Sequence, residues 1–170
     1  MSVLDFLSPD RAEARAGFAP LLRSPLEHAL GEHAAELGIH DISLTTAKIE
    51  VRGGVEQLDF EDGLAVTPNR ALVLAEFERG AELRTELEQR FDTVVDMTGA
   101  LAGVRLERPD AERVLRRMTE LDLRQAPTVG SVAHVPTYVL PDESGYRLFF
   151  PQEYGDYFVE ALVDAAEGLS

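Results

Sequence analysis

The side chains able to do metal or nucleophilic chemistry are scattered along this sequence. Its histidines are His28, His33, His40 and His134. His28 and His33 stand five positions apart in a stretch expected to be helical, so they leave different sides of the helix and are poorly placed to share a metal ion. The absence of cysteine removes disulfides, thiolate metal ligands and cysteine nucleophiles. We therefore predict no catalytic residue and no metal site on this chain.

Motifs for nucleotide binding and for serine nucleophiles are also missing from the sequence. The adjacent glycines of "RGGVEQ" lack the spacing of a dinucleotide-binding loop, and no Walker sequence occurs. No serine is flanked as G-x-S-x-G, and Ser24 is better explained as a helix cap. Asp96, in "VVDMTG", interrupts an apolar strand, and its residue type favours a hydrogen bond within a turn at Thr98 and Gly99. These observations predict no cofactor-binding residue.

Composition limits the partners that this chain can have. With 170 residues, 45% of them hydrophobic, it is long enough for one domain with a real core. The 31 acidic and 16 basic residues give a net charge of −15, which repels nucleic acid and anionic membrane surfaces and could steer a basic protein partner. No apolar run approaches the length of about 18 residues typical of a membrane-spanning helix. Since no export signal is found, we expect a cytoplasmic protein that binds neither nucleic acid nor membrane.

Hydrophobic periodicity predicts an α+β fold, in which antiparallel sheets carry helices on one face. Strands are expected over 41–54 (with a bulge where the alternation changes phase), 70–77, 93–98, 100–107, 131–140 and 146–151. Helices are expected over 24–37, 80–91, 109–119 and 153–169, and the acidic stretch 55–69 is expected to form turns. Pro136 places the strand 131–140 toward a sheet edge.

The chain is expected to divide into an arm and a domain. Residues 1–22 hold six large apolar side chains without a helical or strand period, which indicates a loosely structured N-terminal arm. We expect residues 1–8 of this arm to be mobile or pinned by another chain. Residues 23–170 are expected to form a single α+β domain.

Aromatic residues concentrate near the C-terminus, where seven of the twelve lie between positions 138 and 158. All four tyrosines belong to this group. Tyrosine suits both a core and a protein interface, because it brings a large apolar area together with a polar tip. The helical stripe assigns Phe158 and Leu162 to the core. We therefore predict a partner interface at Tyr138, Tyr154 and Tyr157.

Four segments in order resemble the gamma subunit of heterotetrameric sarcosine oxidase. They are "RSPLEHAL", "LAVTPNRALVLAEFE", "VVDMTGALAGVRLERPDAERVLRRMTELDLR" and "GYRLFFPQEYGDYFVEALVDAA", and the resemblance spans about residues 22–168. That family is itself similar to the N-terminal folate-binding domain of the glycine-cleavage T-protein, the aminomethyltransferase. The shared pattern "D-x-[ST]…v-x-l-x-x-P-D-A-x-x-x-L" is carried here by Asp96, Thr98, Val104, Leu106, Pro109, Asp110, Ala111 and Leu115.

The resemblance implies an accessory, non-catalytic subunit that docks on larger chains, chiefly the alpha subunit. It places FAD, FMN, NAD and tetrahydrofolate on those partner subunits and none on this chain. The implied reaction of the complex is oxidative demethylation of a methylamine, with the one-carbon unit passed to tetrahydrofolate.

A second function stays open, because a free-standing folate-binding module related to aminomethyltransferase would have the same fold. Against it, the region "GSVAHVPTYVLPDESGYRLFF" lacks the acidic pair that the T-protein family carries there, and the sequence ends before the family's C-terminal barrel. A binding module needs a concave apolar pocket, whereas a subunit needs an exposed apolar patch.

Overall fold

The computed structural model describes residues 23–55 and 62–169, so the arm expected over residues 1–22 lies outside the described residues. The strands are β1 (Ile39–Asp41), β2 (Thr46–Arg52), β3 (Gly63–Thr67), β4 (Arg70–Glu76), β5 (Thr93–Asp96), β6 (Leu101–Glu107), β7 (Thr128–Val132), β8 (Val135–Asp142) and β9 (Gly145–Pro151). The α-helices are α2 (Glu32–Glu36), α3 (Gly80–Glu88), α4 (Ala111–Leu115) and α5 (Gly155–Glu167), and the 3₁₀ turns are η3 (Phe77–Arg79), η4 (Leu123–Gln125) and η5 (Gln152–Tyr154).

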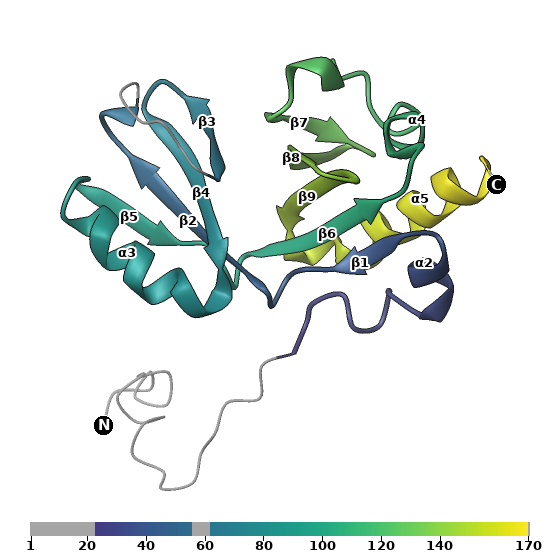
Figure 1. Cartoon of the computed structure of the whole chain (residues 1–170), viewed down its shortest axis with the longest axis horizontal. Helices are drawn as coiled ribbons and strands as arrows, with labels where there is room; N and C mark the ends of the chain where they lie inside the picture. The colour runs from purple at the N-terminus through teal and green to yellow at the C-terminus, as the bar shows by residue number, and fades with distance from the viewer. Residues whose placement is uncertain (1–22, 56–61, 170) are drawn as a thin grey trace, which may run out of the picture.

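The described strands form two antiparallel sheets, and one face of each is turned toward the other sheet (Figure 1). One sheet has five strands in the order β1-β6-β9-β8-β7, and the other has four in the order β3-β4-β2-β5. Helices α4 and α5 cover the outer face of the five-stranded sheet, and α3 covers the outer face of the four-stranded sheet. The predicted α+β class is confirmed, with layers in the order helix, sheet, sheet, helix.

Three clusters of buried side chains hold these layers together. Between the five-stranded sheet and its helices, the rings of Phe150 and Phe158 stack with centroids 3.9 Å apart. Between the four-stranded sheet and α3, Ile49 and Val51 of β2 pack with Leu87 of α3. The third cluster lies between the two sheets, and its buried members are Ile42, Leu64, Leu72, Leu74, Leu101, Tyr138, Leu140 and Phe149.

The prediction of one long bulged strand over 41–54 is wrong, because the chain changes sheets there. Strand β1 pairs with β6 in one sheet, and β2 pairs with β4 and β5 in the other. Turn residues between Ile42 and Thr46 separate the two strands, and this is where the alternation changes phase. A phase shift in a strand pattern therefore marked a crossing between sheets rather than a bulge.

The prediction of a single strand over 131–140 is also wrong, since this stretch belongs to the hairpin β7–β8. Val132 pairs with Val135, so Ala133 and His134 are the two turn residues, with φ of 47° and 64°. Such turns usually contain glycine or asparagine, and neither marks this one. Pro136 pairs with Ser131 of β7, whereas the pairing of β8 with β9 begins only at Tyr138, so the proline needs no hydrogen-bond partner on that side.

The predicted helices are confirmed for α3 and α5 but shortened elsewhere. Residues 25–29 form turns, and only Glu32–Glu36 is helical within the predicted span 24–37. Ser24 Oγ accepts a hydrogen bond from the Leu26 backbone N–H at 3.0 Å, as a cap would. The acidic stretch expected to form turns contains strand β3. In the part of the chain that is described, no helix is long and apolar enough to cross a membrane.

Candidate functional site

Asp96 and Thr98 organise the connection that carries the chain from the four-stranded to the five-stranded sheet. Asp96 Oδ1 accepts a hydrogen bond from the Thr98 backbone N–H at 2.9 Å, which confirms the predicted turn. Thr98 Oγ1 in turn accepts from the backbone N–H of Lys48 in β2 at 3.0 Å. These two members of the T-protein-like pattern therefore fix the path of the backbone.

Lys48 is fully buried at the same junction between the sheets. Its Nζ donates to the backbone carbonyls of Ser43 at 2.8 Å and Leu101 at 3.1 Å, and it lies 5.9 Å from the centre of the Phe149 ring. Burial lowers the pKa of Lys48 from its ordinary value of 10.5 to about 8, although Asp41 and Asp96 act in the opposite direction.

An amine with such a pKa could serve as a base or nucleophile, but a reacting molecule would have to reach it. The Lys48 side chain has no solvent exposure, and its ammonium group is directed at two backbone carbonyls. One acceptor lies between β1 and β2 and the other at the start of β6, where the chain passes between sheets. Lys48 therefore links the two segments in which the chain passes from one sheet to the other. Lys48 is the only lysine of the sequence. Its buried role was not predicted, because the strand alternation places it on the polar face of its strand.

A second buried charge, Glu50, lies two residues further along β2. Its carboxylate is 3% exposed and binds Arg52 at 2.8 Å and Arg70 at 2.7 Å. Arg70 Nη2 also donates to the hydroxyl of Tyr138 at 2.9 Å, across the space between the sheets. Tyr138 is 8% exposed and belongs to the cluster between the sheets. The prediction that Tyr138 lies at a partner interface is therefore corrected, because its ring packs between the two sheets of this chain.

Tyr154 and Tyr157, the other two residues predicted at the interface, lie together on the surface. Tyr154 ends η5 and is 43% exposed, and Tyr157 follows in the first turn of α5 and is 49% exposed. Phe158 and Leu162 face the core as the helical stripe predicted. That both tyrosines contact a partner stays a prediction.

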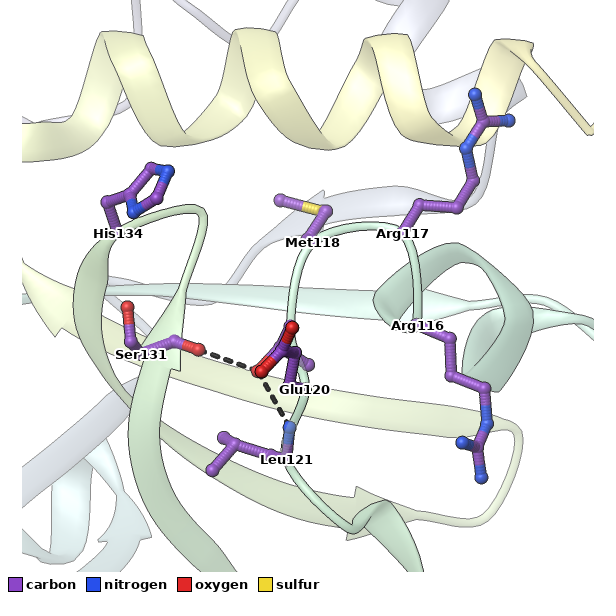
Figure 2. A pocket seen from close by; sticks show the side chains of 8 residues that line it. Arg116, Arg117, Met118, Glu120, Leu121, Ser131 and His134 are labelled. Carbon is purple, nitrogen blue, oxygen red and sulfur yellow. Dashed lines mark hydrogen bonds between the residues drawn. The ribbon is translucent and has the colours of Figure 1, made fainter.

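An open hollow of about 690 Å³ lies beside α5 (Figure 2). It is lined by the segment after α4 and by the β7–β8 hairpin, through Arg116, Arg117, Met118, Thr119, Glu120, Leu121, Ser131 and His134. Thr119 links the two segments, since its Oγ1 donates to the Ser131 carbonyl at 2.6 Å and accepts from the Leu121 N–H at 3.2 Å. Arg116, one of the lining residues, binds Glu112 at 2.7 Å.

A second hollow of about 370 Å³ adjoins the first and reaches Tyr157. The two share Arg117, Met118 and His134, and the second adds Ala161 and Asp164 of α5. Among the described residues, no group of three or more histidines and carboxylates could hold a metal ion. The two hollows are open to solvent, and some of their polar side chains, such as Arg116 and Thr119, are already bonded to neighbouring residues. The surface around them therefore suits contact with another protein better than a chemical reaction.

Comparison with known proteins identifies the fold. No family model matches the chain, and no curated protein matches it. Fourteen chains of solved structures do match. One belongs to heterotetrameric sarcosine oxidase from Corynebacterium sp. U-96 in complex with pyrrole 2-carboxylate, with a TM-score of 0.73 and 20% sequence identity over 89% of this chain and 97% of that chain.

This likeness shows that the chain has a sarcosine oxidase-related α+β fold. The two coverages together mean that the chains are of comparable length, so the fold is shared over nearly the whole of both. The resemblance inferred from the four sequence segments is thus supported at the level of the fold.

Proposed function

We propose that this chain is the gamma-type accessory subunit of a sarcosine oxidase-type complex and has no catalytic residue of its own. The observation that carries this proposal is the match to a chain of a heterotetrameric sarcosine oxidase, which covers 97% of that chain at a TM-score of 0.73. A counterpart subunit would be expected to match over its whole length, whereas a domain of a larger catalytic chain would match over a part.

In the proposed complex the larger subunits, chiefly the alpha subunit, hold FAD, FMN, NAD and tetrahydrofolate. A methylamine such as sarcosine is oxidised there by hydride transfer to flavin, and the one-carbon unit passes to tetrahydrofolate. The role of this chain is then to bind and brace the larger subunits. The two exposed tyrosines beside an open hollow support that role, because interface anchors are enriched in tyrosine.

Co-expression with the larger subunits from the same source tests the proposal. The tagged full-length chain should co-purify with them through size-exclusion chromatography, and the flavin absorbance should follow the complex. The chain purified alone should be colourless, since no cofactor is assigned to it. Failure of the larger subunits to co-purify, or a flavin bound stoichiometrically by the isolated chain, would contradict the proposal.

A further inference from the structure

The C-terminal helix carries an exposed charge of one sign. Between positions 152 and 169 the chain has five carboxylates and no lysine, arginine or histidine. The five are all exposed, and they are Glu153, Asp156, Glu160, Asp164 and Glu167. By contrast, the stretch from η3 to the end of α3 includes Arg79 and Arg84 among its acids. The charge of α5 is therefore a property of this helix and not only of the acidic chain as a whole.

Four of these carboxylates, all but Glu167, lack a cationic partner among residues 23–55 and 62–169. Asp156, Glu160 and Asp164 follow one another at four-residue intervals, a spacing at which like charges destabilise a helix. Helices α3 and α4 instead use this spacing for ion pairs, Arg84 with Glu88 at 2.8 Å and Arg116 with Glu112 at 2.7 Å. The repulsion between these carboxylates is unfavourable when the helix surface is free. Contact with a cationic surface would offset that repulsion.

The row lies beside the exposed tyrosines and the second hollow. Tyr157 and Asp164 both line that hollow, one presenting an aromatic ring and the other a carboxylate. A guanidinium group can bind both, through a cation–π contact and a charge-assisted hydrogen bond. Arg117, which also lines that hollow, reaches the C-terminal end of α5, because a Cβ built on Gly168 would come within 2.2 Å of the Arg117 guanidinium.

We propose that the α5 face, formed by Tyr154, Asp156, Tyr157, Glu160 and Asp164, docks on a cationic, arginine-bearing surface of a larger subunit. This inference rests on the proposed function and adds the chemistry of the partner surface. A second copy of this chain does not fit, since two α5 faces would repel each other. Nucleic acid and anionic membranes do not fit either, since they carry the same sign of charge as this helix and would be repelled.

The test compares two triple variants of the full chain that lose the same charge. In one variant, Asp156→Asn, Glu160→Gln and Asp164→Asn neutralise the row on α5. In the matched control, Glu78→Gln, Glu82→Gln and Glu86→Gln neutralise an equally spaced, exposed row on η3 and α3. Binding of each to the purified larger subunits is measured by biolayer interferometry at about 50 mM and about 500 mM salt, a range over which screening of exposed charges becomes strong.

We expect the α5 variant to bind about tenfold more weakly than wild type at low salt and the control to stay within about twofold. Salt should weaken the binding of wild type and of the control, and should affect the α5 variant much less. A single Glu160→Arg exchange should weaken binding as well, without depending on the triple variant. If wild type binds and the two triple variants bind equally well, the inference is overturned while the proposed function stands. If wild type does not bind the larger subunits at all, both fail.

Discussion

At the scale of single residues, the buried ammonium of Lys48 makes the stability of the fold depend on pH. The folded pKa near 8 lies below the ordinary value of 10.5, so between these values the unfolded chain binds more protons than the folded chain. The free energy of unfolding contributed by this group must therefore rise as pH increases from 8 to 10.5. The full rise is at most about 3 kcal/mol.

Urea denaturation of wild type and Lys48→Met at pH 8 and pH 10.5 tests this expectation. Other groups titrate in the same window, and their effect is removed by subtracting the variant from wild type. We expect the difference in unfolding free energy between the two proteins to shift in favour of wild type as pH rises. An identical pH dependence in both proteins would show that Lys48 titrates alike in the folded and unfolded chains.

The tyrosines allow a second test at this scale, because one is buried and two are exposed. Tyr154→Ala and Tyr157→Ala should weaken binding to the larger subunits by about 2 kcal/mol while leaving the melting temperature of the free chain nearly unchanged. Tyr138→Ala should do the reverse and lower that temperature, since its ring packs between the sheets and its hydroxyl accepts from Arg70. Phe77→Ala, at a 37% exposed ring far along the sequence, is the control.

If Tyr154→Ala and Tyr157→Ala unfold the free chain, or bind as well as wild type, these side chains are not interface anchors. The comparison with Tyr138 is informative because all three residues were predicted together from one aromatic-rich segment. Sequence reasoning could place Tyr154 and Tyr157 outward, because Phe158 and Leu162 occupy the buried stripe. It could not place Tyr138, since both sides of β8 are covered.

At the scale of elements, the β7–β8 turn holds two residues in a conformation that favours glycine and asparagine. Ala133 and His134 have φ of 47° and 64°, a region that costs an ordinary residue about 1 kcal/mol or more. Replacing the pair by Asn-Gly, through Ala133→Asn and His134→Gly, should therefore raise the melting temperature of the free chain. Ala133→Val should lower it, because a branched side chain fits this region poorly. A melting temperature unchanged or lowered by Asn-Gly would contradict the assigned turn.

At the scale of elements, the number of covered faces decided how much of an element's environment the sequence could predict. Helix α5 was recovered because its apolar residues repeat with a clear period, whereas strand β9 is a short run of consecutive apolar residues that is buried on both faces. Strand β2 has Ile49 and Val51 toward α3 and Lys48 and Glu50 toward the other sheet, with both sets buried. A pattern of apolar and polar residues predicts one covered face, so it could not reveal the second sheet.

At the scale of the whole molecule, the two adjoining hollows could not be predicted, because three separate segments together line them. The stretch 116–121, the hairpin turn and α5 are brought together only by the packing of layers. None of the three carries a motif for binding. The sequence signal that could have pointed there is the lack of basic residues between positions 152 and 169.

Folate binding separates the two functions considered from the sequence. We predict that the isolated chain binds tetrahydrofolate no tighter than about 1 mM, or about −4 kcal/mol, because the acidic pair of the T-protein family is missing. Isothermal titration calorimetry on the purified full chain measures this constant. A micromolar constant would favour the free-standing folate-binding module over the accessory subunit.

The most direct test of the accessory-subunit account is native mass spectrometry of the complex formed by co-expression with the larger subunits. The account predicts an assembly whose mass includes 18.7 kDa for one copy of this chain, and which loses that increment when the chain dissociates. The account is contradicted if the larger subunits assemble at full occupancy without this chain and the chain elutes alone.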